Sequence, residues 1–177
     1  MSTICGIIDF SDNSKGRDFE LLRQMWCSVS VLGRAYAYMN NGFSICCDRQ
    51  QSAFCSLPSA AQKKGENCTL VLDSSPPFPS YTRDILNRYL HDGAQALCEL
   101  EDKTGFVLFD EADRFVMLSS ARTKFYCTRA EDSGKIFFAT EERAVYSLLG
   151  LGIDLHTPAV TIFPHGLAMH CDLRARI

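Results

Sequence analysis

The sequence predicts an α+β protein in which helices cover the faces of antiparallel sheets. Short β-branched or apolar runs lie near both ends of the chain, and helical spacing of apolar residues recurs in three stretches. Four further apolar runs, separated by turn residues, occupy the second half. Helices with one apolar stripe and strands of this length bury their apolar faces best in stacked layers. The length of 177 residues favours a single domain spanning 1–177.

The first half is predicted as strand, helix, hairpin, strand and helix. Apolar residues at steps of three and four indicate helices, and Asn40-Asn41-Gly42 between two apolar runs is typical of a hairpin turn. The prolines of 76–79 indicate a rigid loop, and the polar segment 50–66 has no assignment. The predicted elements are a strand over 3–10, a helix over 18–32 ending at Gly33, a hairpin over 35–47, a strand over 68–72 and a helix from Ser80 to Gly93. On that second helix, Tyr81 is expected on the apolar face with Ile85 and Tyr89.

The second half is predicted as a short helix, four strands, a helix and a last strand. The runs are a helix over 94–100, strands over 105–109, 115–119, 124–128 and 136–139, a helix over 141–149 and a strand over 160–163. Because acidic turns separate the four strands, they are expected to form one meander. Thr140 is the expected N-cap of the helix that follows, and Gly150 and Gly152 its end.

Composition excludes several classes of function. A net charge of −3 and the lack of a basic run disfavour nucleic-acid binding. No apolar run approaches the ~18 residues of a membrane span. The nine cysteines are odd in number, and the N-terminus lacks the pattern of a signal peptide. We therefore expect a cytoplasmic globular protein with reduced thiols, without a cofactor or metal; the spacing of His165, His170 and Cys171 matches no common zinc set.

Several strings resemble the class II glutamine amidotransferase domain, as found at the N-terminus of asparagine synthetase. The matching strings are Cys5-Gly6-Ile7-Ile8-Asp9-Phe10, Thr104–Asp110, Ala121–Tyr126, Phe138–Val145 and Phe163–Gly166. The resemblance covers nearly the whole chain. It implies a four-layer αββα sandwich of two antiparallel sheets, as in N-terminal nucleophile (Ntn) hydrolases, and hydrolysis of glutamine to release ammonia.

The resemblance implies that Cys5 is the catalytic nucleophile. In that family the thiol attacks the side-chain amide of glutamine, and the free α-amine of the same residue acts as the base. An acylated nitrogen cannot carry that proton, so activity requires cleavage of the Ile4–Cys5 bond and removal of residues 1–4 as a propeptide. The alternative is that Cys5 is an inert, buried strand residue.

Four residues fall on substrate-binding positions of the family. Arg49 would bind the carboxylate of glutamine, Asp84 its amino group, and Asp73 with Ser74 would form the oxyanion loop. The Asn and Gly of that loop are missing, and Asp73 offers negative charge where negative charge develops, at a site where one donor is worth about 3–4 kcal/mol. The alternatives are a surface arginine at Arg49 and a helix-dipole role for Asp84.

Two functions from different classes follow. The first is a stand-alone glutaminase domain that supplies ammonia to a partner synthetase. The second is a catalytically degenerate domain that serves as a binding or scaffold partner of an amide-forming enzyme. A third possibility is an Ntn amidase acting on another amide. The acceptor, the oligomeric state and the pathway are not predicted.

Overall fold

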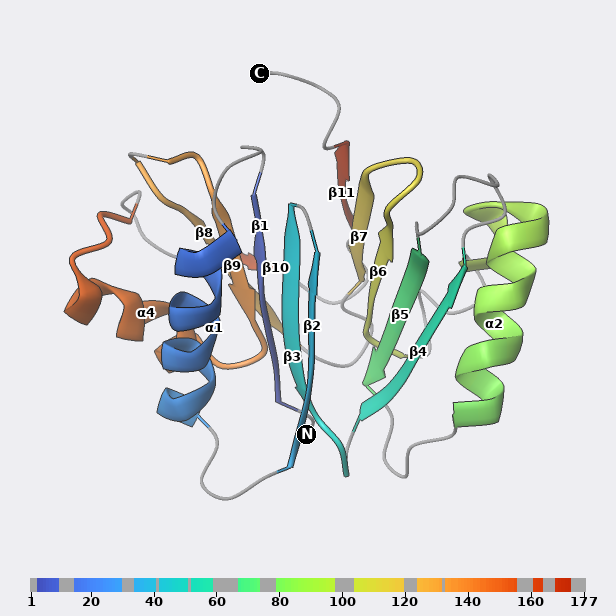
Figure 1. Ribbon diagram of the computed structural model, residues 1–177, viewed down its shortest axis with the longest axis horizontal. Helices are drawn as coiled ribbons and strands as arrows, with labels where there is room; N and C mark the ends of the chain where they lie inside the picture. Colours follow the sequence, from blue (N-terminus) through green and yellow to red (C-terminus); the bar gives the residue numbers. More distant parts are fainter. Residues whose placement is uncertain are drawn as a thin grey trace.

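The protein contains two antiparallel sheets with helices on their outer faces. In a computed structural model of the chain we describe residues 3–9, 15–29, 34–40, 42–50, 52–58, 67–73, 79–97, 104–119, 124–131, 133–155, 161–163 and 168–172. All described strand pairs are antiparallel. Figure 1 shows helices α1 and α4 outside one sheet and helix α2 outside the other. The predicted α+β class is therefore confirmed.

The first sheet has six described strands in the order β10-β8-β9-β1-β3-β2. Their bounds are β1 Ile4–Ile8, β2 Ala35–Asn40, β3 Phe43–Asp48, β8 Phe125–Arg129, β9 Ile136–Ala139 and β10 Thr161–Phe163. Strand β1 pairs with β3 on one side and with β9 on the other. The predicted hairpin is confirmed, because β2 pairs with β3 and Asn40 lies opposite Phe43.

The second sheet has five described strands in the order β11-β7-β6-β5-β4. Their bounds are β4 Ser52–Pro58, β5 Asn67–Asp73, β6 Phe106–Asp110, β7 Phe115–Ser119 and β11 Ala168–Asp172. The helices are α1 Lys15–Val29, α2 Pro79–Asp92 and α4 Glu142–Tyr146, which continues as the 3₁₀ helix η1, Ser147–Leu151. Helix α1 packs on β1 and β3, whereas α2 packs on β4 and β5.

Three hydrophobic clusters fill the spaces between these layers. Strand side chains alternate between faces, so Ile4 and Ile8 lie between the sheets while Cys5 and Ile7 face α1 and α4. The third cluster lies between α2 and the second sheet. Gly6 permits the close approach of neighbouring strands, because a Cβ there would lie 2.8 Å from the Ser44 carbonyl oxygen and closer still to the Phe138 ring.

The predicted meander is wrong. Strands β6 and β7 belong to the five-stranded sheet, whereas β8 and β9 belong to the six-stranded sheet. The sequence shows four strands separated by turns, but neighbouring strands of similar composition carry no mark of the sheet they join. Strand β4 lies in the segment without an assignment, and β11 was also not predicted.

Two residue-level predictions are also wrong. Thr140 does not cap a helix with its side chain: the backbone N–H of Ile4 donates to its Oγ1 at 3.0 Å. Glu141 is the N-cap residue, and it forms no side-chain cap bond within the described residues. On α2, Tyr81 is 49% exposed and Thr82 is buried instead. Three other predictions fall on residues outside the described ranges: the helix end at Gly33, the proline loop within 74–78 and the end of the short helix at 98–100.

Candidate functional site

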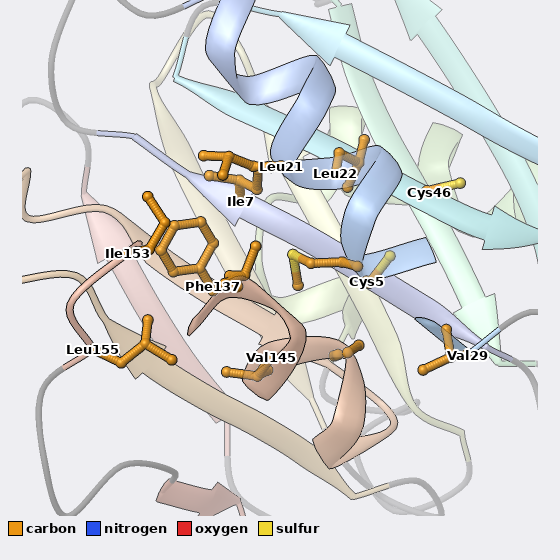
Figure 2. Close-up of a cluster of buried hydrophobic side chains, with 14 of the residues drawn as sticks. Cys5, Ile7, Leu21, Leu22, Val29, Cys46, Phe137, Val145, Ile153 and Leu155 are labelled. Carbon is orange, nitrogen blue, oxygen red and sulfur yellow. The ribbon is translucent and has the colours of Figure 1, made fainter. Parts of the chain in front are cut away.

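Cys5 lies in the middle of the helix-facing hydrophobic cluster. Its side chain is 0% exposed and packs in the cluster with residues of α1, β9 and α4. Figure 2 shows its sulfur among apolar side chains, including Val29, Phe137 and Val145. Because β1 is a central strand, the sheet covers one side of Cys5 and the helices cover the other.

The environment of Cys5 disfavours the thiolate. Burial raises the pKa of its thiol well above the ordinary value, and the neighbouring thiols of Cys46 and Cys47 raise the pKa further. A thiolate is the nucleophilic form of cysteine, and reactive cysteines lie in electropositive, partly accessible places. The position of Cys5 therefore favours an inert neutral thiol.

The Ile4–Cys5 peptide bond lies within the paired part of the first sheet. Ile4 lies opposite Cys47, and Cys5 lies opposite both Cys46 and Ala139. The N–H of Thr140 donates to the Ile4 carbonyl at 2.9 Å. Ile4 is itself 0% exposed. A protease would reach this bond only after β1 had separated from its neighbours.

The residues before this bond are also held in place. The N–H of Asp48 donates to the Thr3 carbonyl at 3.0 Å. The Thr3 hydroxyl donates to Glu141 Oε1 at 3.2 Å. The hydrogen-bonded part of the first sheet thus extends in front of Cys5.

Arg49 directly follows β3 and lies on the surface. Its N–H donates to the Arg34 carbonyl at 2.9 Å. Its guanidinium carbon lies 4.4 Å from the centre of the Tyr36 ring, a cation–π contact. Tyr36 in turn stacks on Phe54 of β4, with ring centres 5.5 Å apart. Arg49 is therefore part of an aromatic stack that links the edge strands β2 and β4.

Asp73 ends β5 in the second sheet. Its N–H donates to the Gly105 carbonyl at 2.8 Å, and its own carbonyl accepts from the Thr104 hydroxyl at 2.7 Å. Because Val71 belongs to the cluster between the sheets, the period of two places Asp73 on that same face. Ser74, the other residue of the predicted oxyanion loop, lies outside the described residues.

Asp84 lies on the exposed side of α2, far from Cys5. Helix α2 covers the outer face of the second sheet, and Cys5 faces the helices on the outer face of the first (Figure 1). Both sheets therefore lie between Cys5 and Asp84. Arg49 and Asp73 lie at one end of the molecule, because Ser52, which follows Arg49 closely, pairs with Asp73. Cys5 and Asp84 do not share one cleft in this arrangement.

A buried ion cluster was not predicted. The Lys135 ammonium pairs with Asp9 Oδ2 at 2.9 Å and with Asp18 Oδ1, and all three side chains are buried. The cluster joins the end of β1, the first turn of α1 and the start of β9. A cavity of about 100 Å³ beside it is lined by Asp18, Met39, Asn40 and Ser44. These residues come from distant parts of the sequence, so no local motif marks the cluster.

Within the described residues, no group of three or more His, Cys, Asp or Glu side chains is arranged to hold a metal ion. No described helix is long and apolar enough to cross a membrane. Comparison with known proteins found no protein-family model that matches the chain and no curated protein significantly similar to it.

Proposed function

We propose that the chain is a catalytically degenerate relative of the class II glutamine amidotransferases. In this proposal it keeps the αββα Ntn-hydrolase fold and serves as a binding or scaffold partner of an amide-forming enzyme. The observation that carries the proposal is the state of Cys5, which is fully buried in an apolar cluster with a raised pKa. A nucleophile requires access to substrate and a stabilised thiolate, and Cys5 has neither in this fold.

The other predicted site residues support the same proposal. Asp84 lies on the opposite outer layer from Cys5, and the guanidinium of Arg49 stacks on Tyr36. Glutamine has a carboxylate, an amine and a side-chain amide, all of which must be bound at once for its hydrolysis. Residues so far apart do not bind the three groups of one small molecule.

The ancestry is supported by the matching strings and by the layer order. The strings that resemble the amidotransferase domain fall on β1, β6, β9 and the start of α4, in the order expected of that family. A family fold with an altered site fits a binding role, since function depends on the site and not on the fold alone.

The catalytic part of the proposal is tested with a glutaminase assay. A chain that begins at Cys5, with its free amine, is compared with the full chain and with Cys5→Ala made in the truncated chain. We expect ammonia release at the same background level in all three proteins. Glutamine-dependent ammonia release by the truncated chain that Cys5→Ala abolishes would contradict the proposal and favour the glutaminase function.

The partner role is tested by reconstitution. An asparagine-synthetase-type synthetase lacking its own amidotransferase domain is mixed with the full chain, and amide formation is measured with ammonia and with glutamine. We expect a stable complex, detected by co-sedimentation, in which only ammonia supports the reaction. A glutamine-supported rate would identify an active amidotransferase, and failure to bind would contradict the scaffold role.

A further inference from the structure

A small cavity lies between helix α1 and the hairpin of strands β2 and β3. Its volume is about 100 Å³, and it is lined by Asp18, Met39, Asn40 and Ser44. A water molecule needs a cavity of about 10–15 Å³, and an apolar cavity of about 150 Å³ binds benzene. By the same proportion, the cavity beside α1 has room for an organic molecule of about four non-hydrogen atoms.

Ser44 brings a buried hydroxyl to this cavity. Its strand neighbours Phe43 and Ile45 lie in the cluster between the sheets, so Ser44 points toward the α1 side of the first sheet. Ser44 is 1% exposed, and its hydroxyl forms no hydrogen bond to another described residue. A buried hydroxyl without a partner is unfavourable. A molecule in the cavity that bonds to this hydroxyl is therefore favoured.

Asp18 brings a carboxylate to the same cavity from the first turn of α1. The residue is 5% exposed, and its Oδ1 accepts a hydrogen bond from the Lys135 ammonium. A carboxylate has about four acceptor positions and no donor, whereas a serine hydroxyl both donates and accepts. A molecule that bonds to both groups therefore has a donor for Asp18 and an acceptor for the Ser44 hydroxyl.

The charges beside the cavity favour an uncharged molecule. An anion would lie next to the Asp18 carboxylate, and a cation would lie close to the Lys135 ammonium that pairs with it. Like charges repel strongly where bulk water is excluded. An amide is the uncharged group with an N–H donor and a carbonyl acceptor side by side. Met39, which lies opposite Ser44 in the hairpin, supplies apolar surface for an alkyl part.

We propose that this cavity binds the primary carboxamide group of a small molecule. The amide N–H donates to the Asp18 carboxylate, the amide carbonyl accepts from the Ser44 hydroxyl, and the alkyl part lies against Met39. Because Met39 is 38% exposed, a longer alkyl part leaves the cavity past this side chain. Such a site is separate from the scaffold role proposed above, so either can fail without the other.

The test compares three small probes of the same shape. Acetamide, acetate and acetamidinium have the same number of non-hydrogen atoms and differ in charge. Each is titrated into the full chain while NMR follows the backbone amides of Asp18, Met39 and Ser44. We expect saturable shifts with acetamide, with a Kd in the roughly millimolar range of so small a ligand. Acetate and acetamidinium are expected to bind about tenfold more weakly or less.

Two variants connect the binding to named groups. Ser44→Ala removes the hydroxyl and is expected to weaken acetamide binding roughly tenfold. Asp18→Asn removes the negative charge, keeps the shape and leaves the Lys135 ammonium nearby, so this variant is expected to bind acetate more tightly than the unmodified chain does. Ser56→Ala is the matched control: Ser56 lies on β4 of the second sheet, where its hydroxyl pairs with that of Thr69, so acetamide binding should not change.

Three results would overturn the proposal. The first is the absence of saturable shifts with acetamide, as expected of a cavity that holds only water. The second is binding of acetate or acetamidinium to the unmodified chain as tightly as acetamide. The third is acetamide binding that Ser44→Ala leaves unchanged. Circular dichroism establishes that each variant is folded, and if Asp18→Asn does not fold, the three probes and Ser44→Ala still decide.

Discussion

At the scale of single residues, burial controls the chemistry of the cysteines near β1. Burial, with a further contribution from Cys27, raises the pKa of Cys46 to about 12. Burial also raises the pKa of Cys47 to about 12, with contributions from Cys46 and Asp48, opposed by Ser52. A thiol with such a pKa is protonated at every physiological pH. These residues pack as small apolar groups within the first sheet.

The raised pKa values predict loss of stability at alkaline pH. The ordinary thiol pKa is 9.0, so the unfolded chain loses its thiol protons before the folded chain does. Between pH 9 and about 12 the folded state binds more protons, and stability falls as pH rises. We expect Cys47→Val to reduce this slope, by at most about 1.4 kcal/mol per pH unit.

The measurement is the free energy of unfolding in denaturant at several alkaline pH values. Leu149→Ala is the control, because Leu149 is exposed and carries no titratable group, so its replacement should leave the slope unchanged. Equal slopes for the unmodified chain and Cys47→Val would show that burial does not perturb this thiol.

At the scale of elements, the buried ion cluster determines how α1 sits on the first sheet. Lys135 precedes β9, Asp9 follows β1 and Asp18 lies in the first turn of α1. Buried ion pairs add little net stability over apolar packing, but removing one partner leaves an uncompensated charge. The cluster therefore favours one position of α1, the helix that covers Cys5.

Replacing the shared cation should be strongly destabilising. We expect Lys135→Met to lower the free energy of unfolding by about 3–5 kcal/mol, because it leaves two buried carboxylates without their ammonium. Denaturant unfolding followed by circular dichroism measures the effect. Lys124→Met removes an exposed lysine and should change stability by less than about 0.5 kcal/mol.

A triple variant separates charge from packing. Adding Asp9→Asn and Asp18→Asn to Lys135→Met removes all three charges and should recover part of the lost stability. If the triple variant were less stable than Lys135→Met alone, the carboxylates would not be the source of the destabilisation.

At the scale of the whole molecule, β1 holds the first sheet together. It connects the hairpin of β2 and β3 to the strands β8 to β10, and it separates the helix-facing cluster from the cluster between the sheets. The amine-assisted mechanism would require removal of residues 1–4, which include Ile4, the first residue of β1. That processing has a cost in stability.

Truncation measures this cost. A chain that begins at Cys5 loses the buried side chain of Ile4 and its bonds to Thr140, so we expect its free energy of unfolding to be lower by about 2–5 kcal/mol. A chain that begins at Thr3 keeps every described contact and should match the full chain. A truncated chain as stable as the full chain would remove the stability argument against processing.

Most element types could be predicted from the sequence, because the local spacing of apolar residues shows whether a helix or a strand would place them on one face. The hairpin over 35–47, the buried first strand and α2 follow from such spacing and from turn residues. Strand β4 could not be predicted, since its Ser-Ala-Phe-Cys-Ser run has weak alternation within a polar segment. The candidate nucleophile could be named only through the resemblance.

What the sequence by itself determined is therefore the order and kind of most elements, with β4 and β11 missed. Only the tertiary structure decided that β6 and β7 join one sheet and β8 and β9 the other, that Cys5 faces the helices, and that Asp9, Asp18 and Lys135 meet. The physical reason is the distance along the chain over which each kind of interaction acts. Periodicity records which faces of an element are apolar, whereas the partner that covers each face is set by packing between segments far apart in the chain.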